Sequence, residues 1–196
     1  MFLAGHETTA SALTWILYLI ARVPSVEQRI LAEVERIAGH GPVEFAHVKD
    51  MHYVRNVFRE ALRLYPPITF MPRVALENTR IGERRVKRGA LVMISPWVMH
   101  RHLRLWKDPD AFDPDRFSAE REAEIPQWAY IPFGQGPRIC VGQAFAMAEA
   151  VLMLAELLRR YAFEPLAPGD VRPVARLTTR PDRQILCRIR PRGSAA

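Results

Sequence analysis

The stretch FGQGPRICVGQAFA, residues 133–146, joins a loop rich in glycine and proline to an apolar segment with helical spacing. Gly134 and Gly136 permit backbone angles that other residues avoid, and they let a flat ligand approach closely. Pro137 stiffens the loop. Cys140 stands where the helix is expected to start, a position at which unpaired N–H groups and the helix dipole stabilise a thiolate. The stretch predicts a presented thiolate, although a buried structural cysteine also fits the loop taken alone.

The complete spacing F-x-x-G-x-R-x-C-x-G closely resembles the haem-binding signature of the cytochrome P450 family of haem-thiolate monooxygenases. The matching positions are Phe133, Gly136, Arg138, Cys140 and Gly142. The resemblance implies that Cys140 is the axial ligand of a haem b iron and that Arg138 pairs with a haem propionate. A thiolate ligand donates electron density to iron and favours cleavage of the O–O bond.

A second segment, AGHETT at residues 4–9, agrees at all six positions with part of the helix that crosses above the haem in this family. From the residues alone, a glutamate on a helix surface is the ordinary interpretation. The resemblance implies that Glu7 and Thr8 are catalytic and relay protons to oxygen at the haem, which is general acid catalysis. It also implies that Ala4 and Gly5 adjoin the haem and leave room for O₂ or water.

Glu60 and Arg63 lie three residues apart and can pair on one helical face. The same E-x-x-R spacing occurs three more times in the chain, so the spacing alone is not specific. The context is more informative, because the helix ends in LYPP and the segment DPDRF follows at 113–117. The resemblance implies a buried structural network of Glu60, Arg63 and Arg116 that holds the cysteine loop. Asp115 stands where the family more often has glutamate.

Two further correspondences rest on single residues. Arg73, in FMPRVA, matches a position that contacts a haem propionate in many family members, and an exposed surface arginine fits this position equally well. His100, in VMHRH, is expected at the haem periphery. The six histidines are too scattered to suggest a zinc site, and the neighbours of Cys140 match neither the papain nor the caspase signature of a cysteine hydrolase.

The composition is that of a globular protein, with 49% hydrophobic and 25% charged residues among 196 and a net charge of +7. The basic segment RIGERRVKR, residues 80–88, has no accompanying nucleic-acid-binding motif, so we expect a solvated face or a docking surface for an acidic protein rather than a nucleic-acid site. Only two cysteines are present, which fits a reducing compartment and favours a cytoplasmic location. The apolar run at 13–21 is shorter than the roughly 20 residues that span a bilayer, so no membrane segment is expected in this chain. Cys187 is expected to be a core or strand residue.

The patterns predict a mainly α fold with small β-sheets. Helical periodicity predicts helices over residues 2–22, 24–39, 51–65 and 140–161. Short β-type runs predict two or three strands within 73–100, with the segment KRG at 87–89 as a hairpin turn, and a closing hairpin at 171–190. Residues 106–132 are expected to form a long ordered loop whose aromatic residues pack: Trp106, Phe112, Phe117, Trp128 and Tyr130. The resemblance implies that the predicted segments correspond to five parts of the family's fold: the remnant of the distal helix, the ExxR helix, the meander loop, the Cys loop and the long final helix.

The resemblance covers essentially the whole chain, but only the C-terminal half of the family's fold. We therefore expect residues 1–196 to be a partial, truncated domain that leaves apolar surface bare. The implied function is insertion of one oxygen atom from O₂ into a small hydrophobic substrate. Electrons would come from a ferredoxin or flavoprotein reductase that docks near Cys140, at Arg55, Arg59 and Arg138. The alternatives are a non-catalytic remnant with weak or no haem binding and a peroxide-using haem-thiolate enzyme.

Overall fold

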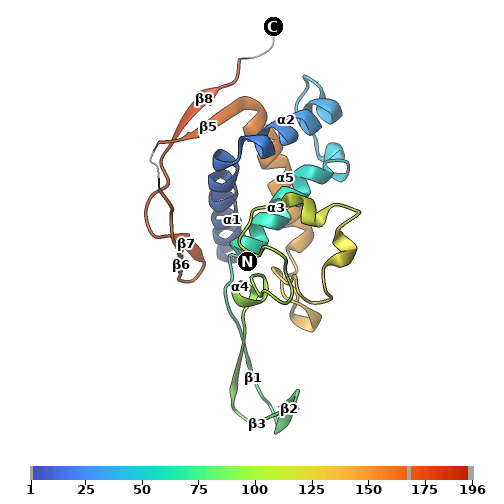
Figure 1. The fold of residues 1–196 in the computed structure, drawn as a ribbon, viewed down its shortest axis with the longest axis vertical. Coiled ribbons are helices and arrows are strands. Elements are labelled where there is room, and N and C mark those ends of the chain that lie inside the picture. The colour runs from blue at the N-terminus through green and yellow to red at the C-terminus, as the bar shows by residue number, and fades with distance from the viewer. Residues whose placement is uncertain (1, 167–168, 194–196) are drawn as a thin grey trace.

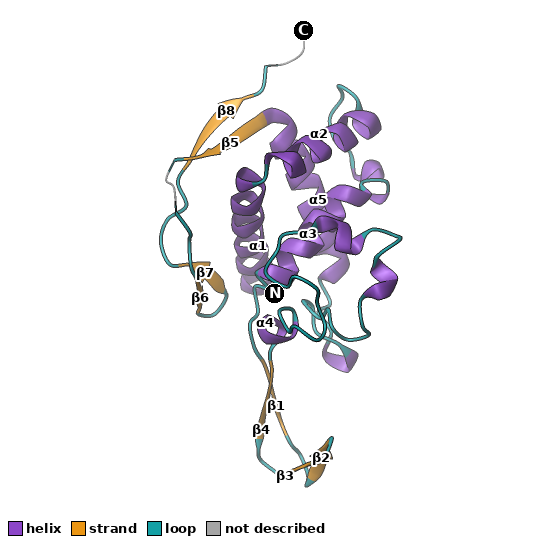
Figure 2. Ribbon diagram, in the orientation of Figure 1, coloured by secondary structure: helices purple, strands orange, loops and turns teal. Residues whose placement is uncertain are grey.

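The structure is a computed structural model that describes residues 2–166 and 169–193, with side chains from Ala4 onward. In this part of the chain the α-helices are α1 (Phe2–Arg22), α2 (Pro24–Ala38), α3 (His52–Leu64), α4 (Pro96–Met99) and α5 (Gln143–Arg160). Short 3-10 helices lie at Phe45–Lys49, Pro114–Phe117, Glu122–Glu124 and Gly136–Arg138. The strands are β1 (Met71–Val74), β2 (Thr79–Ile81), β3 (Arg84–Val86), β4 (Leu91–Ile94), β5 (Tyr161–Pro165), β6 (Pro173–Ala175), β7 (Thr179–Pro181) and β8 (Cys187–Pro191). The prediction of a mainly helical fold with small sheets is confirmed (Figures 1 and 2).

The hydrophobic core lies between α1, α2, α3 and α5. Apolar residues of α3 recur every three or four positions, so one face of the helix is buried. They include Val54, Val57, Phe58 and Ala61. From α1, the indole of Trp15 is fully buried and stacks on the ring of Tyr65, just after α3, with 4.0 Å between ring centroids. The helices thereby form one packed body to which the loops and sheets attach.

The helix ends differ from the predicted ones at α5. This helix begins at Gln143 rather than at Cys140, because Gly142 occupies the N-cap position. It ends at Arg160 rather than at Tyr161, because Tyr161 starts strand β5 and pairs with Pro191 of β8. Helix α3 ends at Leu64, shortly before Pro66 and Pro67, since residues preceding a proline disfavour the helical conformation.

Residues 71–94 form a β-arm that projects from the helical body (Figure 1). Strand β1 pairs antiparallel with β4, and the shorter pair of β2 and β3 lies between them in sequence. The prediction of a hairpin turn at residues 87–89 is wrong in part: a turn forms there, with the N–H of Ala90 donating to the carbonyl of Lys87 (3.0 Å), but the flanking strands β3 and β4 are not paired with each other. The tight turn is at Gly82, whose φ is +57°, because β3 pairs with β2. Residues 87–89 instead bring the chain back toward β1, and the N–H of Gly89 donates to the carbonyl of Ala75.

The C-terminal segment forms two separate ladders, so the prediction of a single closing hairpin at 171–190 is wrong in part. Strands β6 and β7 form a short hairpin, whereas β8 pairs with β5. The β6–β7 hairpin is fixed to the helices through Thr179. Its carbonyl accepts hydrogen bonds from Ser11 Oγ (2.7 Å) and Trp15 Nε1 (2.9 Å) of α1. Its N–H donates to the carbonyl of Pro67 at 2.9 Å.

The long loop between α4 and α5 is ordered by a small second core. This core contains the buried side chains of Trp106, Phe117 and Ala129, against which Tyr130 packs. Trp128 is the exception among the aromatic residues expected to pack, since it is 54% exposed and has a φ of +67°. The neighbouring Ala129 takes the buried position instead.

Among the described helices, none alone has the length and apolar character of a membrane span; α1 and α2 meet that test only as a pair, bent by 108°.

Candidate functional site

The cysteine loop is closed by a backbone hydrogen bond at its base. The N–H of Cys140 donates to the carbonyl of Phe133 at 2.9 Å, so this N–H is not one of the unpaired donors that we expected at a helix start. Cys140 precedes the first residue of α5 by three positions. Gly134 has a φ of +76°, and a Cβ there would lie 3.3 Å from Met71 Sδ of β1. The loop therefore needs glycine at this point, for both its backbone angle and its contact with β1.

The thiol of Cys140 is exposed, and apolar side chains near it in the sequence are exposed as well. Val141 is 88% exposed and Phe145 is 72% exposed, and Ile139 is also exposed. A Cβ on Gly142 would lie 3.9 Å from Cys140 Sγ, so glycine leaves the thiol open on this side. Ile139 and Val141 are the chain neighbours of Cys140, so exposed apolar surface lies beside the thiol.

The donor set around Cys140 fits a haem iron better than a bare metal ion. Within the described residues, no three His, Cys, Asp or Glu side chains gather into a metal site. A metal held by Cys140 must therefore take its other ligands from outside these side chains, as iron does in a haem. The exposed apolar residues beside the thiol suit the flat, apolar face of a porphyrin.

Two arginines expected to contact haem propionates lie on segments next to each other. Arg138 ends the 3-10 helix Gly136–Arg138 of the cysteine loop and is exposed. Arg73 lies in β1, two residues after Met71, so both side chains leave the same face of the strand. Met71 contacts the loop at Gly134, as described above. Arg73 is exposed, and its Nη1 donates to the carbonyl of Pro72 at 2.9 Å.

Glu7 of α1 is bound to the β6–β7 hairpin. Its Oε1 accepts hydrogen bonds from Arg180 Nε (3.0 Å) and Thr178 Oγ1 (2.8 Å) and also from Arg180 Nη2. The hydrogen bonds from Arg180, and then that from Thr178, lower the pKa of Glu7. Sequence reasoning missed both partners, because they lie about 170 residues further along the chain.

The hydroxyl of Thr8 points back along its own helix and donates to the carbonyl of Ala4 at 2.8 Å. Ala4 and Gly5 are exposed, and a Cβ on Gly5 would meet nothing within 4 Å. This stretch of α1 is therefore open on the side of the two small residues.

Glu60, Arg63 and Arg116 form a buried charge network. Arg63 makes two hydrogen bonds to Glu60, from Nε to Oε2 (2.7 Å) and from Nη2 to Oε1 (2.8 Å). Arg116 Nε reaches Glu60 Oε1 at 3.2 Å, and the N–H of Asp113 reaches the same oxygen at 3.0 Å. Glu60 and Arg63 have no exposed surface. Asp115 takes no part in this network and instead binds Arg29 of α2 through two hydrogen bonds of 2.8 Å.

The remaining donors of the two buried arginines bind backbone carbonyls of the long loop. Arg63 donates to the carbonyls of His100 (2.8 Å), Pro109 (2.6 Å) and Ala111 (3.0 Å). Arg116 donates to the carbonyls of Lys107 and Asp108. The network therefore fastens the loop that leads to Cys140 onto α3.

His100 also links α3 to this loop. Its side chain is completely buried. Nε2 accepts from the N–H of Ile131 (2.9 Å), which leaves Nδ1 to donate to the carbonyl of Arg63 (3.2 Å). Burial lowers the pKa of His100 to about 3. A neutral imidazole with both nitrogens occupied is a structural bridge.

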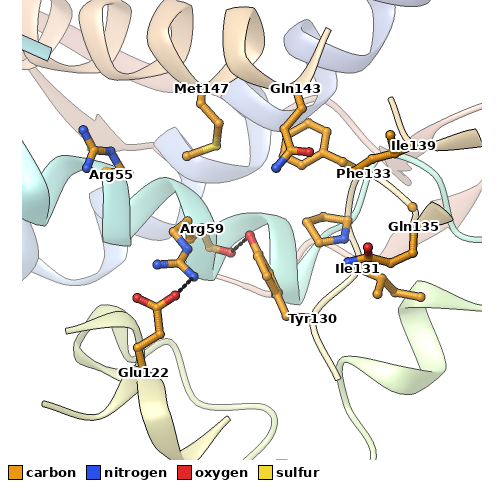
Figure 3. A pocket seen from close by; sticks show the side chains of 12 residues that line it. Arg55, Arg59, Glu122, Tyr130, Ile131, Phe133, Gln135, Ile139, Gln143 and Met147 are labelled. Carbon is orange, nitrogen blue, oxygen red and sulfur yellow. Dashed lines mark hydrogen bonds and ion pairs between the residues drawn. The ribbon is translucent and has the colours of Figure 1, made fainter. Parts of the chain in front are cut away.

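A cleft of about 360 Å³ lies between α3, the start of α5 and the cysteine loop (Figure 3). Arg55 and Arg59 of α3 line it, as do apolar and amide side chains of the loop and of α5: Ile131, Phe133, Gln135, Ile139, Gln143 and Met147. Arg59 also pairs with Glu122, and its carbonyl accepts a hydrogen bond from Tyr130 (3.0 Å). Two of the three arginines expected near an electron donor thus share this cleft, while Arg138 lies outside its lining.

The comparisons with known proteins all point to one family. The chain matches the family model of cytochrome P450 over residues 1–188. It is 43% identical to cyclooctatin synthase of Streptomyces melanosporofaciens over 88% of this chain and 38% of that protein. It is 36% identical to cyclooctat-9-en-7-ol 5-monooxygenase of the same organism over 85% of this chain and 36% of that protein. It is 33% identical to pentalenene oxygenase of Streptomyces avermitilis over 96% of this chain and 42% of that protein.

The chain thus spans less than half the length of these relatives. The match extends over nearly all of its own residues, however, and includes both the cysteine loop and the Glu7 segment. The chain belongs to the cytochrome P450 family.

Proposed function

We propose that this chain is the thiolate-bearing part of a haem-thiolate monooxygenase, which inserts one oxygen atom from O₂ into a small hydrophobic organic substrate. The observation that carries the proposal is the exposed thiol of Cys140, which lies on a loop closed at its base and is bordered by exposed apolar side chains. The names of the relatives support the reaction class, since they include a monooxygenase and an oxygenase.

In this proposal Cys140 ligates the iron of haem b, and Arg138 and Arg73 bind the propionates. Bound haem would supply the chemistry that activates O₂. Gly136, with a φ of +71°, shapes the loop, and Phe133 closes it through its carbonyl. Gly142 keeps the side of the thiol open, since any Cβ there would contact the sulfur.

Glu7 and Thr8 would provide the proton path. The hydrogen bonds from Arg180 and Thr178 all go to Oε1 of Glu7, so Oε2 would be the oxygen that takes up a proton from water. The hydroxyl of Thr8 keeps its proton on the carbonyl of Ala4 and can accept another hydrogen bond through its oxygen. Ala4 and Gly5 leave room for O₂ or water beside these two residues.

Residues 1–196 would then be a partial domain, since relatives more than twice as long align with the chain over most of its length. Substrate contacts would come in large part from segments that correspond to the rest of those relatives. The location we propose is cytoplasmic, in keeping with two free cysteines.

The cleft beside the cysteine loop would receive the electron donor, a ferredoxin or flavoprotein reductase. Arg55 and Arg59 line this cleft together with Phe133 and Ile139, which belong to the loop that carries Cys140. An acidic partner seated there would lie close to the backbone that leads to the sulfur. Complementary charge mainly raises the rate of such an encounter and selects the partner.

The proposal is tested by the spectrum of the chain after reconstitution with haem, reduction and addition of carbon monoxide. We expect the red-shifted Soret band of a thiolate-ligated complex, which Cys140→Ala should abolish. Cys187→Ala is the matched control, because the Cys187 thiol is half-buried in β8 and burial raises its pKa. A spectrum typical of histidine ligation, or one that loses the band only in Cys187→Ala, would contradict the proposal.

A further inference from the structure

Met71 of β1 is a point at which the β-arm touches the cysteine loop. A Cβ built on Gly134 would lie only 3.3 Å from Met71 Sδ, so the thioether packs against the backbone of the loop. Met71 is half-buried, so solvent still reaches part of the residue. The residue thus combines a packed contact on the loop with partial exposure to solvent.

This contact lies where the exposed part of the cysteine loop begins. Gly134 is buried, whereas residues 135–140 are all exposed. The exposed part is closed by the hydrogen bond from the N–H of Cys140 to the carbonyl of Phe133 (2.9 Å), and Phe133 is the residue just before Gly134. A change at the Met71 contact therefore acts beside the hydrogen bond that closes the loop.

The strand register separates Met71 from a second methionine of the same arm. Met71 lies opposite Ile94 in the β1–β4 ladder, and Met93 lies opposite Pro72. Because successive residues of a strand point to opposite faces, Met93 leaves the face that Met71 does not. Met93 is 49% exposed. The arm thus carries one thioether that packs on the cysteine loop and one on its other face.

Hydrogen peroxide converts a methionine thioether to a sulfoxide. The sulfur donates an electron pair to one peroxide oxygen, an S–O bond forms, the O–O bond breaks, and the second oxygen leaves as water. The product is polar where the thioether was apolar, and it is larger by one oxygen atom. The contact of Met71 with the loop has little spare room, since even the Cβ of an alanine at Gly134 would lie 3.3 Å from the sulfur. Oxidation of Met71 would therefore disturb this contact through both size and polarity.

We propose that Met71 is a peroxide-sensitive modification site, and that its conversion to the sulfoxide loosens the cysteine loop. The oxidant is hydrogen peroxide, the two-electron reduction product of O₂. Methionine sulfoxide reductase restores the thioether, so the change is reversible. The proposal goes beyond the oxygenase function proposed above, because the test supplies the peroxide and measures the backbone of the loop without haem.

Hydrogen exchange in the full chain after mild peroxide treatment tests the proposal. Dithiothreitol is added after the peroxide, because it returns Cys140 and Cys187 to thiols and leaves methionine sulfoxide unchanged. Mass spectrometry of peptides then measures the oxygen gained at each methionine. We expect the amide hydrogen of Cys140, which is bonded to the carbonyl of Phe133, to exchange about tenfold faster once Met71 is oxidised. This factor follows from the usual cost of forcing an extra group into a packed contact.

Met71→Leu keeps an apolar side chain of similar size and forms no sulfoxide, so peroxide should leave its loop exchange unchanged. Met93→Leu is the matched control, and its loop should still loosen because Met71 remains. Met71→Gln places a polar group at the contact and should speed the exchange without peroxide. Methionine sulfoxide reductase should reverse the effect in the treated wild-type chain, which keeps the test independent of how well any variant folds.

Four results would overturn the proposal. The first is a Met71 that gains no oxygen while Met93 does, and the second is unchanged exchange at Cys140 when Met71 is fully oxidised. The third is equal acceleration by peroxide in Met71→Leu and in the wild-type chain. The fourth is an acceleration that disappears in Met147→Leu instead, which would assign the sensitivity to the methionine of α5 that lines the cleft (Figure 3).

Discussion

Replacement of Glu60 by alanine would test the buried charge network most directly. The carboxylate of Glu60 is the only acidic group in that network, and it binds the guanidinium groups of Arg63 and Arg116 and the N–H of Asp113. Both arginines stay charged when it is removed, because a guanidinium does not lose its proton in proteins. Deleting one partner of a buried ion pair costs about 3–5 kcal/mol. We expect Glu60→Ala to lower the free energy of unfolding by that amount.

Glu164→Ala is a suitable control, because Glu164 also forms ion pairs with two arginines, Arg188 and Arg190, but its side chain is 47% exposed. Exposed ion pairs contribute about 0.2–1 kcal/mol. Urea unfolding followed by circular dichroism compares the two variants. With a slope of about 2 kcal/mol per molar urea, the midpoint should fall by about 1.5–2.5 M for Glu60→Ala and by less than about 0.5 M for Glu164→Ala.

Equal midpoint shifts in the two variants would refute this reasoning, because they would show that burial adds nothing to the ion pair. Glu60→Gln sharpens the test. It keeps the size and one oxygen acceptor, but it removes the negative charge and replaces the second acceptor oxygen with an NH₂ group. If Glu60→Gln is as stable as the wild-type chain, the hydrogen bonds rather than the charge hold Arg63 and Arg116.

Three further predictions concern single side chains. The unfolding free energy should fall by about 2 kcal/mol more in the wild-type chain than in His100→Gln between pH 7 and pH 5. The reason is that unfolded His100 takes up a proton below about pH 6.5, whereas the folded side chain stays neutral down to about pH 3. Parallel pH profiles of the unfolding free energy in the two chains, measured by urea unfolding, would contradict this. Arg180→Gln should raise the pKa of Glu7 toward 4.5, as read from an NMR titration of its carboxyl carbon, and an unchanged pKa would remove Arg180 as the cause. Gly134→Ala should lower the unfolding free energy by about 1–2 kcal/mol because of the left-handed backbone at this position, and contact of the new Cβ with Met71 should lower it further. In the control Gly193→Ala the new Cβ meets no neighbour, so the urea midpoint should change little.

Features set by local spacing could be predicted from the sequence. The helices follow from apolar periodicity, and Pro66 and Pro67 mark the end of α3. Glu60 and Arg63 are three residues apart on one helix, so their contact needs no knowledge of the tertiary fold. Arg116 could be added only because the resemblance pointed to it, since its contact with Glu60 spans 56 residues.

Features set by distant partners could not be predicted in this way. Strand β5 follows α5 directly, and its pairing with β8 makes it a strand. The partner of Glu7, Arg180, lies in β7 and is one of many arginines in the sequence. The sequence does not show that His100 pairs with the carbonyl of Arg63 and the N–H of Ile131, because these partners lie 37 and 31 residues away.

The bonds around Thr179 have a consequence for the order in which the protein assembles during synthesis. Ser11 and Trp15 are buried and donate to the carbonyl of a residue that is made 164 to 168 positions later. At about 5–20 residues per second, translation leaves these two donors without that acceptor for roughly 10–30 s. We expect α1 to pack on α2, α3 and α5 before it gains these two hydrogen bonds from the β6–β7 hairpin. A ribosome that stalls before Thr179 would then leave the hydroxyl of Ser11 and the indole N–H of Trp15 without this acceptor, although the whole of the cysteine loop has already been made.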